Sequence, residues 1–206
     1  MTRFWFIRHG QTDWNLRGCF QGHIDVPLNG TGHAQARALA ARLAATPADA
    51  IYASDLQRAR QTAEPLAAAW QRPLQLLPGF REQAFGIVEG LDLPAVQREH
   101  PALWADWLRQ QSDFALPGGE SLRSFAARVL GGVHTLAAAH PGGEVAVVTH
   151  GGVLDVLWRT AQGLPLDVPR ACTIPNTGIN RLRWSADTLA IEAWADDAHL
   201  RAAVTD

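Results

Sequence analysis

Residues 3–10 read RFWFIRHG, and residues 145–152 read VAVVTHGG. Each stretch contains a short apolar run, rich in aromatic or β-branched side chains, and leads into a histidine that is followed by glycine. Continuous apolar runs of this length are typical of strands buried on both faces of a parallel sheet. We therefore expect the two runs to form buried parallel strands, with His9 and His150 just past their carboxyl ends.

The rest of the chain alternates between strand and helix patterns. Short apolar runs predict strands at 3–7, 50–53, 74–77 and 145–148, and a closing hairpin at 178–184 and 188–194. Apolar residues at helical spacing predict helices at 31–45, 55–70, 120–138 and 153–162. The helix at 55–70 is preceded by Ser54 and carries Gln57 at the spacing of a capping box. Such alternation favours an α/β fold, a three-layer α/β/α sandwich with a mainly parallel central sheet.

Residues 91–117 interrupt this alternation, because they contain three prolines and two tryptophans. We expect a small helical insertion there, over the sheet edge and the site described below. No internal repeat or linker is evident, so residues 1–206 are expected to form a single domain.

The basic residues are all arginine: the chain has 18 of them and no lysine. This excludes the lysine-dependent chemistries, namely Walker-A nucleotide binding, protein-kinase phosphotransfer and Schiff-base formation. The net charge is −2 with no block of like charge, so we expect neither a nucleic-acid nor a membrane partner. The apolar runs are too short for a signal peptide or a membrane span, and Cys19 and Cys172 form no CxxC pair. We expect a cytoplasmic protein with reduced thiols.

Ligands of open parallel sheets bind at the carboxyl ends of the strands, which is where His9 and His150 are expected. Arg8 precedes the first of them, and Arg58 lies in the first turn of a predicted helix. Together with helix-start amides, these side chains would suit a phosphoryl dianion. Taken singly, each also has an ordinary interpretation, as a core histidine or a solvated arginine. Two guanidinium groups would oppose a cation and the HExxH pattern is absent, so we expect no metal and no cofactor.

Other nucleophiles for phosphoryl transfer can be tested against the sequence. A cysteine phosphatase needs arginine six residues after the thiol, but Asp25 and Gly178 occupy those positions. The Asp-x-Asp pattern of aspartyl-phosphate enzymes and the GxSxG pattern of serine esterases do not occur. Histidine is the nucleophile that remains.

At this point several segments resemble, in order, the motifs of the histidine phosphatase superfamily, the phosphoglycerate mutase-like proteins. The segments are FIRHGQTDWN at 6–15, QGHIDVPL at 21–28, SDLQRARQTA at 54–63, REQAFGIVEG at 81–90, GGES at 118–121 and VTHGG at 148–152. The last 50 residues match the family only loosely. The resemblance implies the family's fold and assigns roles to individual residues.

By this resemblance, His9 is the nucleophile that becomes phosphohistidine. Arg8, Arg58 and His150 would hold the phosphoryl oxygens and neutralise charge in the transition state. His9 must be neutral to attack, and the two neighbouring guanidinium groups should lower its pKa below the usual 6.5.

The resemblance makes Glu82 the acid that protonates the leaving oxygen and the base that then activates water. An acid that donates near neutral pH must be partly desolvated, so we expect Glu82 to be partly buried. Glu89 is the rival candidate, and the motif favours a structural role for it. Glu120 is expected at a helix start, where its carboxylate would meet the helix dipole.

Neutral groups would complete the site. The resemblance implies that Asn15 and the Gly10 and Gly151 amides donate to the phosphoryl group, and that Gln21 and Gly22 contact the substrate. The other histidines match no catalytic position: they are His23, His33, His100, His134, His140 and His199.

The function implied is hydrolysis of a small-molecule phosphomonoester such as a sugar phosphate or α-ribazole phosphate, by a metal-independent monomer or homodimer. One alternative is a 2,3-bisphosphoglycerate-dependent phosphoglycerate mutase. The absence of lysine, the separation of Arg98 from Arg109 and the presence of Gly152 where mutases usually carry asparagine all disfavour it. A catalytically inactive phosphate-binding module is a further alternative, but every implied site residue is present.

Aromatic side chains could line an apolar mouth for a nucleotide-like or aromatic substrate, or could simply form the core of the insertion. They are Phe20, Phe85, Trp104, Trp107 and Phe114. The sequence favours the second interpretation and does not decide the substrate.

Overall fold

A computed structural model describes residues 1–109 and 111–201 of the chain. The strands are β1 (Thr2–Arg8), β2 (Ala50–Ala53), β3 (Leu74–Leu76), β4 (Glu144–Thr149), β5 (Ile179–Ser185) and β6 (Thr188–Asp196). The α-helices are α1 (Asp13–Arg17), α2 (Gly30–Leu43), α3 (Gln57–Trp70), α4 (Leu93–Glu99), α5 (Pro101–Leu108), α6 (Leu122–Ala139), α7 (Gly151–Gln162) and α8 (Ala198–Arg201). Two short 3-10 helices, η1 (Pro78–Phe80) and η2 (Gly86–Val88), lie between β3 and α4.

The six strands form one sheet in the order β3-β2-β4-β1-β5-β6. The pairs among β3, β2, β4 and β1 are parallel, whereas β5 runs antiparallel to both β1 and β6. The predicted mainly parallel sheet and its closing hairpin are therefore confirmed.

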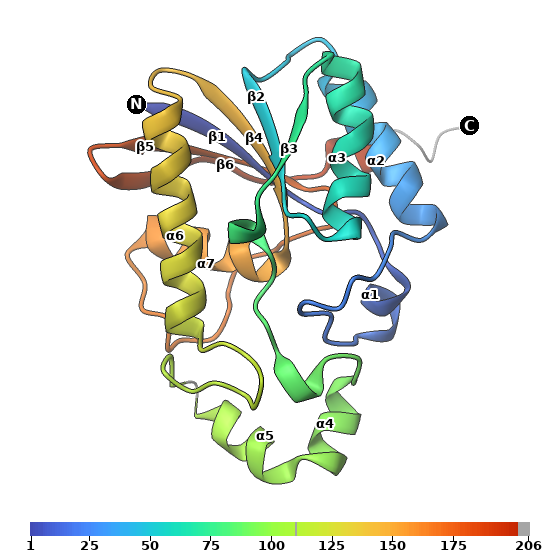
Figure 1. The fold of residues 1–206 in the computed structure, drawn as a ribbon, viewed down its shortest axis with the longest axis vertical. Coiled ribbons are helices and arrows are strands. Elements are labelled where there is room, and N and C mark those ends of the chain that lie inside the picture. Colours follow the sequence, from blue (N-terminus) through green and yellow to red (C-terminus); the bar gives the residue numbers. More distant parts are fainter. Residues whose placement is uncertain (110, 202–206) are drawn as a thin grey trace.

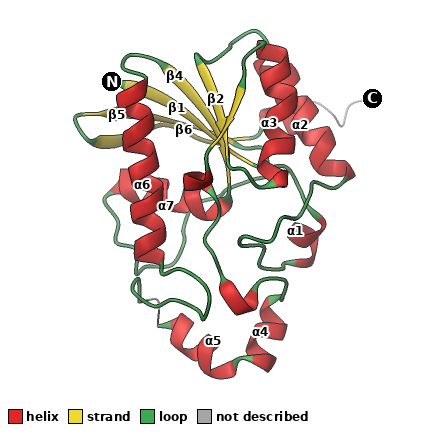
Figure 2. Ribbon diagram, viewed as in Figure 1, coloured by secondary structure: helices red, strands yellow, loops and turns green. Residues whose placement is uncertain are grey.

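Side chains alternate across the sheet and so build two cores. Phe4 and Phe6 of β1 pack in one cluster with α6 and α7, while Trp5 and Ile7 pack in the other with α2 and α3. Figure 2 shows the corresponding helices on the two sides of the sheet. The three-layer sandwich is thus confirmed, and both core faces of β1 exclude water, as its continuous apolar sequence predicts.

The stretch 91–117 contains α4 and α5, which lie away from the sheet, at the bottom of Figure 1. A separate apolar cluster holds them against the loop before α4, with Val96 and Leu116 buried. Trp107 packs on Phe20, with ring centroids 5.0 Å apart. Residue 110 of this stretch lies outside the described residues. Of the described helices, none has the length and apolar character needed to span a membrane.

The start of α3 differs from the predicted capping box. The helix begins at Gln57, and its N-cap is Leu56, which has no side-chain cap. Asp25, from a loop far back in the chain, accepts the Gln57 N–H at 2.6 Å instead. Ser54 is used elsewhere, because its hydroxyl lies 2.8 Å from His150 Nε2. Long-range contacts have therefore replaced the local motif.

Candidate active site

The carboxyl ends of β1 and β4 meet at one edge of the sheet. Arg8 lies opposite Thr149 in the parallel register, and the His9 N–H donates to the Thr149 carbonyl at 2.8 Å. The residues that follow are therefore neighbours, and the rings of His9 and His150 lie 5.2 Å apart between centroids. A cavity of about 450 Å³ opens at this edge, which is a size typical of small-molecule sites.

Most residues predicted for the site line this cavity. They are Arg8, His9, Asn15, Gln21, Arg58, Glu82 and Gly151. Gly10, Gly22 and His150 do not line it. The chain thus brings β1, β4, the start of α3 and the loop after η1 to one point, although they are far apart in sequence.

The His9 ring is oriented by its own backbone. Its Nδ1 lies 2.7 Å from the Gly10 carbonyl, so Nδ1 carries the hydrogen and donates it. Nε2 then holds the lone pair. Burial, followed by the charges of Arg58 and Arg8, holds the pKa of His9 well below its usual 6.5. The predicted direction is confirmed, with burial as the larger cause. A neutral imidazole with a free nitrogen lone pair has the chemistry that a nucleophile needs at neutral pH.

Two arginines supply positive charge beside this ring: Arg58 is buried, and Arg8 is partly buried. Arg8 Nη1 donates to the Ile174 carbonyl at 2.6 Å, whereas its buried Nε makes no hydrogen bond within the described residues. Arg58 donates from Nη1 and Nη2 to the carbonyls of Ile24 and Gly22 at 2.9 and 2.8 Å. Burial lowers the pKa of Arg58 to about 10, which leaves it charged at neutral pH. Each terminal nitrogen has a second N–H, so donors remain for an anion.

His150 lies behind this pair and is fully buried. Its Nδ1 accepts from Arg58 Nε at 3.2 Å, so Nε2 carries the hydrogen and donates to the Ser54 hydroxyl. Burial is the main reason that the pKa of His150 also lies well below 6.5. With both nitrogens engaged, the ring here orients Arg58. A direct bond from His150 to a phosphoryl oxygen stays a prediction.

Glycines allow the close approaches at this edge. A Cβ atom on Gly10 would lie 2.7 Å from the Gly32 carbonyl oxygen, and the Gly10 N–H is taken by Thr62 Oγ1 at 2.9 Å. This corrects the expectation that the Gly10 amide is offered to a ligand. Gly151 is the first residue of α7, where a helix N–H has no partner within the helix. Gly22 has a φ of 48° and acts through its carbonyl, which fixes Arg58.

Two amide side chains face the cavity. The Asn15 Oδ1 accepts from the Thr12 N–H at 3.0 Å, which leaves its nitrogen as the donor end. Gln21 is buried, and its Oε1 has no hydrogen-bond partner in the described part of the chain. Both positions are consistent with the predicted contacts to a polar ligand.

Glu82 reaches the cavity from the loop between η1 and η2 and is half-buried, as expected. Its carboxylate accepts the Gly152 N–H at 3.0 and 3.1 Å and the Gln83 N–H at 2.9 Å. These bonds place the carboxylate at the start of α7, beside Gly151 and across from the histidines.

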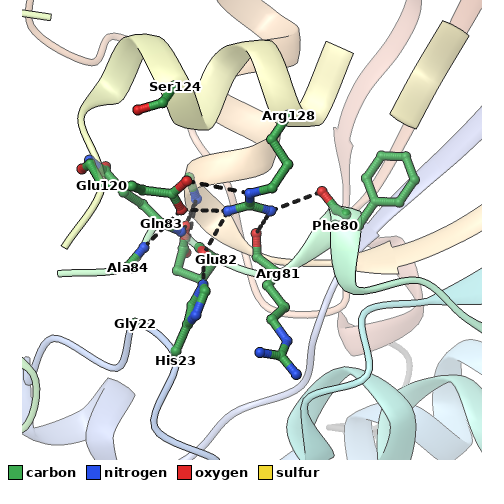
Figure 3. A network of polar contacts seen from close by, with 12 residues as sticks. Gly22, His23, Phe80, Arg81, Glu82, Gln83, Ala84, Glu120, Ser124 and Arg128 are labelled. Atoms are coloured by element: carbon green, nitrogen blue, oxygen red, sulfur yellow. Dashed lines mark hydrogen bonds and ion pairs between the residues drawn. The ribbon is translucent and has the colours of Figure 1, made fainter. Parts of the chain in front are cut away.

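The loop that carries Glu82 has little regular structure, and Arg128 of α6 pins its backbone (Figure 3). The guanidinium donates to the carbonyls of Gly79, Arg81 and Glu82 at 2.9, 3.1 and 3.2 Å. His23 Nε2 lies 2.9 Å from the Glu82 carbonyl as well. A partly buried guanidinium with several backbone acceptors fixes the loop much as a strand pairing would.

The other two glutamates of this region have structural contacts. Glu89 accepts the N–H groups of His23 and Phe85 at 3.0 and 2.9 Å, and so joins two loops as predicted. Glu120 is not at a helix start, because α6 begins after the N-cap Ser121. Its carboxylate instead binds the Ala84 N–H at 3.0 Å and pairs with Arg128. The expected contact with the helix dipole is therefore wrong.

Several contributors were missed from the sequence. They are Ser54, Thr62, Asp155, Arg128 and Arg170, together with the side chain of His23. Ser54, Thr62 and His23 lie inside the motif segments at 54–63 and 21–28, which is a signal for them. The others act through contacts that only the folded chain creates.

In the described ranges, no group of three or more His, Cys, Asp or Glu side chains is placed to hold a metal ion.

Comparison with known proteins adds to this geometry. A family model described as histidine phosphatase superfamily (branch 1) matches residues 4–197. The chain belongs to the histidine phosphatase superfamily. The match extends well past β4, where the motifs end, and it covers the hairpin that sequence reasoning could relate only loosely to the family.

Relatives within the superfamily carry phosphatase and mutase-like names. Phosphoglycerate mutase-like protein 4 of Arabidopsis thaliana is 34% identical and aligns over 94% of this chain and 85% of its own. A metal-independent phosphoserine phosphatase of the same plant is 33% identical over 97% and 84%. A mycobacterial glucosyl-3-phosphoglycerate phosphatase structure, 29% identical, superposes with a TM-score of 0.83 and covers 94% of this chain and 99% of that one.

Two of the buried histidines, His9 and His150, should make stability depend on pH. Below pH 6.5 the unfolded chain binds protons at His9 and His150, whereas the folded chain resists them because both pKa values are lowered. Stability should therefore fall as pH drops from 7 to 5, by at most about 1.4 kcal/mol per histidine per pH unit. Urea unfolding at both pH values measures this difference.

His9→Asn should show a smaller difference, since one of the two titrations is lost, whereas the exposed His33→Asn serves as the control. An unchanged difference in His9→Asn would contradict the lowered pKa of His9.

Proposed function

We propose that this protein hydrolyses small-molecule phosphomonoesters through a phosphohistidine formed on His9 Nε2. The observation that carries the proposal is the His9 ring, which is neutral, held at Nδ1 by the Gly10 carbonyl and set beside Arg8 and Arg58. A fixed lone pair next to two guanidinium groups is what an in-line attack on a phosphoryl group requires.

In the first step, His9 Nε2 attacks phosphorus, the N–P bond forms and the P–O ester bond breaks. The electron pair leaves with the ester oxygen, and Glu82 in its acid form gives that oxygen a proton. Arg8 and Arg58 neutralise the phosphoryl oxygens as charge develops. The Gly10 carbonyl, which accepts from Nδ1–H, stabilises the positive charge that the ring acquires.

In the second step, water attacks phosphorus and the N–P bond breaks, so that the electron pair returns to His9. The Glu82 carboxylate takes the proton from water and thereby recovers its acid form. Inorganic phosphate leaves, and both residues are ready for another cycle.

Hydrolysis is favoured over mutase chemistry, although relatives carry both kinds of name. A mutase must also hold the second phosphate group of its bisphosphate and keep water away from phosphohistidine, and this chain has no lysine at all, whereas the mutases that it resembles carry one near the site. A metal-independent reaction is favoured because Arg8 and Arg58 supply the positive charge that a metal ion would otherwise supply. One named relative is itself called metal-independent.

Activity should survive EDTA and be blocked by vanadate. Vanadate adopts the trigonal geometry of the transferring phosphoryl group and should bind far more tightly than phosphate. Release of p-nitrophenol from p-nitrophenyl phosphate, with and without each reagent, measures both effects. Loss of activity in EDTA that Mg²⁺ or Zn²⁺ restores would overturn the metal-independent mechanism.

A phosphate-release screen over sugar phosphates, nucleotides, phosphoserine and α-ribazole phosphate would identify the substrate. It should include 3-phosphoglycerate with 2,3-bisphosphoglycerate, followed by product analysis. Formation of 2-phosphoglycerate faster than phosphate would make the protein a mutase.

A further inference from the structure

A third guanidinium reaches the cavity from the loop between α7 and β5. Arg170 lines the cavity together with Arg8 and Glu82. A Cβ atom on Gly151 would lie 3.7 Å from Arg8 Nε and 4.0 Å from Arg170 Nη1. The same point is 3.9 Å from Glu82 Oε2. The two arginines and the glutamate therefore surround the first residue of α7.

The charge of Arg170 is not balanced by its own neighbours. Its Nε lies 3.4 Å from Asp155 Oδ1, and 49% of its side chain is exposed. Asp155 is shared, because its other oxygen lies 3.0 Å from Arg159 Nε, and these two side chains are buried. One carboxylate thus serves two guanidinium groups. With Glu82 in the acid form that the proposed first step requires, one positive charge is left at the cavity.

This charge is additional to what a phosphoryl group needs. Arg8 and Arg58 already provide two positive charges for a phosphoryl dianion. Under the proposed mechanism, Glu82 marks the side of the leaving group, since it protonates the ester oxygen. Arg170 lies near both Arg8 and Glu82, so it is placed to meet a leaving group on the Glu82 side of the phosphoryl group.

The space for a leaving group continues past Arg170 into a second cavity of about 180 Å³. The two cavities share the lining residues Gln83, Phe85, Trp107, Leu122 and Arg170. A leaving group several bonds long would therefore pass this guanidinium.

We propose that Arg170 binds a carboxylate of the leaving group, so that the preferred substrates are phosphomonoesters with a carboxylate a few bonds from the ester oxygen. This inference rests on the proposed function. Asp155 lies 3.4 Å from the Nε of Arg170, and within the described residues neither Nη nitrogen takes part in a hydrogen bond, so both can donate to a ligand. A planar guanidinium can donate two parallel hydrogen bonds to a carboxylate, and the partial burial of the cavity strengthens them.

The test compares substrates that differ only in the carboxylate: 3-phosphoglycerate with glycerol 3-phosphate, and phosphoserine with phosphoethanolamine. Arg170→Gln should raise KM for the carboxylate-bearing member of each pair by roughly 10- to 100-fold, the range for a hydrogen bond to a charged group. The member without a carboxylate should change less than about twofold, and Arg170→Lys should recover part of the loss. Arg123→Gln is the matched control, because Arg123 is exposed and pairs with Asp113 away from both cavities.

Binding provides a readout that does not need turnover. In a His9→Ala background, calorimetry should show tighter binding of 3-phosphoglycerate than of glycerol 3-phosphate, and Arg170→Gln should remove the difference. Equal binding of the two compounds, or an equal loss of both, would overturn the role of Arg170. Hydrolysis of p-nitrophenyl phosphate tests the proposed function separately, because that substrate has no carboxylate.

Discussion

Replacement of His9 by alanine is expected to abolish phosphate release and to leave no phosphoprotein that can be trapped. The ring supplies the only protein atom that bonds to phosphorus in the proposed mechanism, and it is held for that purpose by the Gly10 carbonyl at 2.7 Å. Arg8 and Arg58 can still bind the substrate, so the variant should bind substrate although it does not hydrolyse it. The loss should reach the detection limit of a phosphate-release assay, since a water molecule cannot reproduce the position of a fixed nucleophile.

Trapping of the phosphoprotein tests directly whether the phosphoryl group is bound to a histidine. Acid-labile, base-stable labelling after a millisecond quench is the signature of a phosphohistidine, and wild-type protein should show it. His33→Ala, which removes an exposed histidine, is the control. His9→Asn keeps more of the buried volume and separates loss of the nucleophile from loss of the fold. Substantial turnover in a folded His9→Asn variant would remove His9 as the nucleophile.

The sequence was sufficient to predict those parts of the structure that neighbouring residues along the chain determine. Phe4 to Ile7 are apolar without interruption because β1 has a core on each face, and the same holds for β4. Two such strands in parallel bring the residues after them together, so the meeting of His9 and His150 followed from the pattern.

The sequence was insufficient to predict the partner of a polar group that can bind to several residues far away in the chain. Ser54 has the spacing of a cap but binds His150, because Asp25 reaches the helix start instead. The Gly10 N–H donates to the Thr62 hydroxyl and is therefore not available to a ligand. Nothing in the sequence distinguishes Arg170 from the other arginines. Its proposed role depends on the fold, which makes Arg159 and Arg170 share the single carboxylate of Asp155.

Replacement of Glu82 by glutamine is expected to slow turnover of poor leaving groups by about 10²–10⁴, the usual contribution of a general acid. An amide cannot give a proton to the ester oxygen, so an alkyl phosphate must leave as an alkoxide. An activated ester such as 2,4-dinitrophenyl phosphate needs no proton and should lose much less in the first step. Glu89→Gln is the matched control, because Glu89 lies just past η2 and its carboxylate contacts the backbone N–H groups of His23 and Phe85.

The same variant separates the two steps of the mechanism. With 2,4-dinitrophenyl phosphate, His9 should still be phosphorylated, but water must then attack without a general base. Phosphohistidine should accumulate, and stopped-flow absorbance should show a burst of dinitrophenol equal to the enzyme concentration, followed by slow turnover. Glu89→Gln should show no such burst and should lose the same factor on both substrates, because it only positions the loop. An equal loss on good and poor leaving groups in Glu82→Gln, without a burst, would mean that Glu82 also acts only by position and that the acid must be sought elsewhere in the cavity.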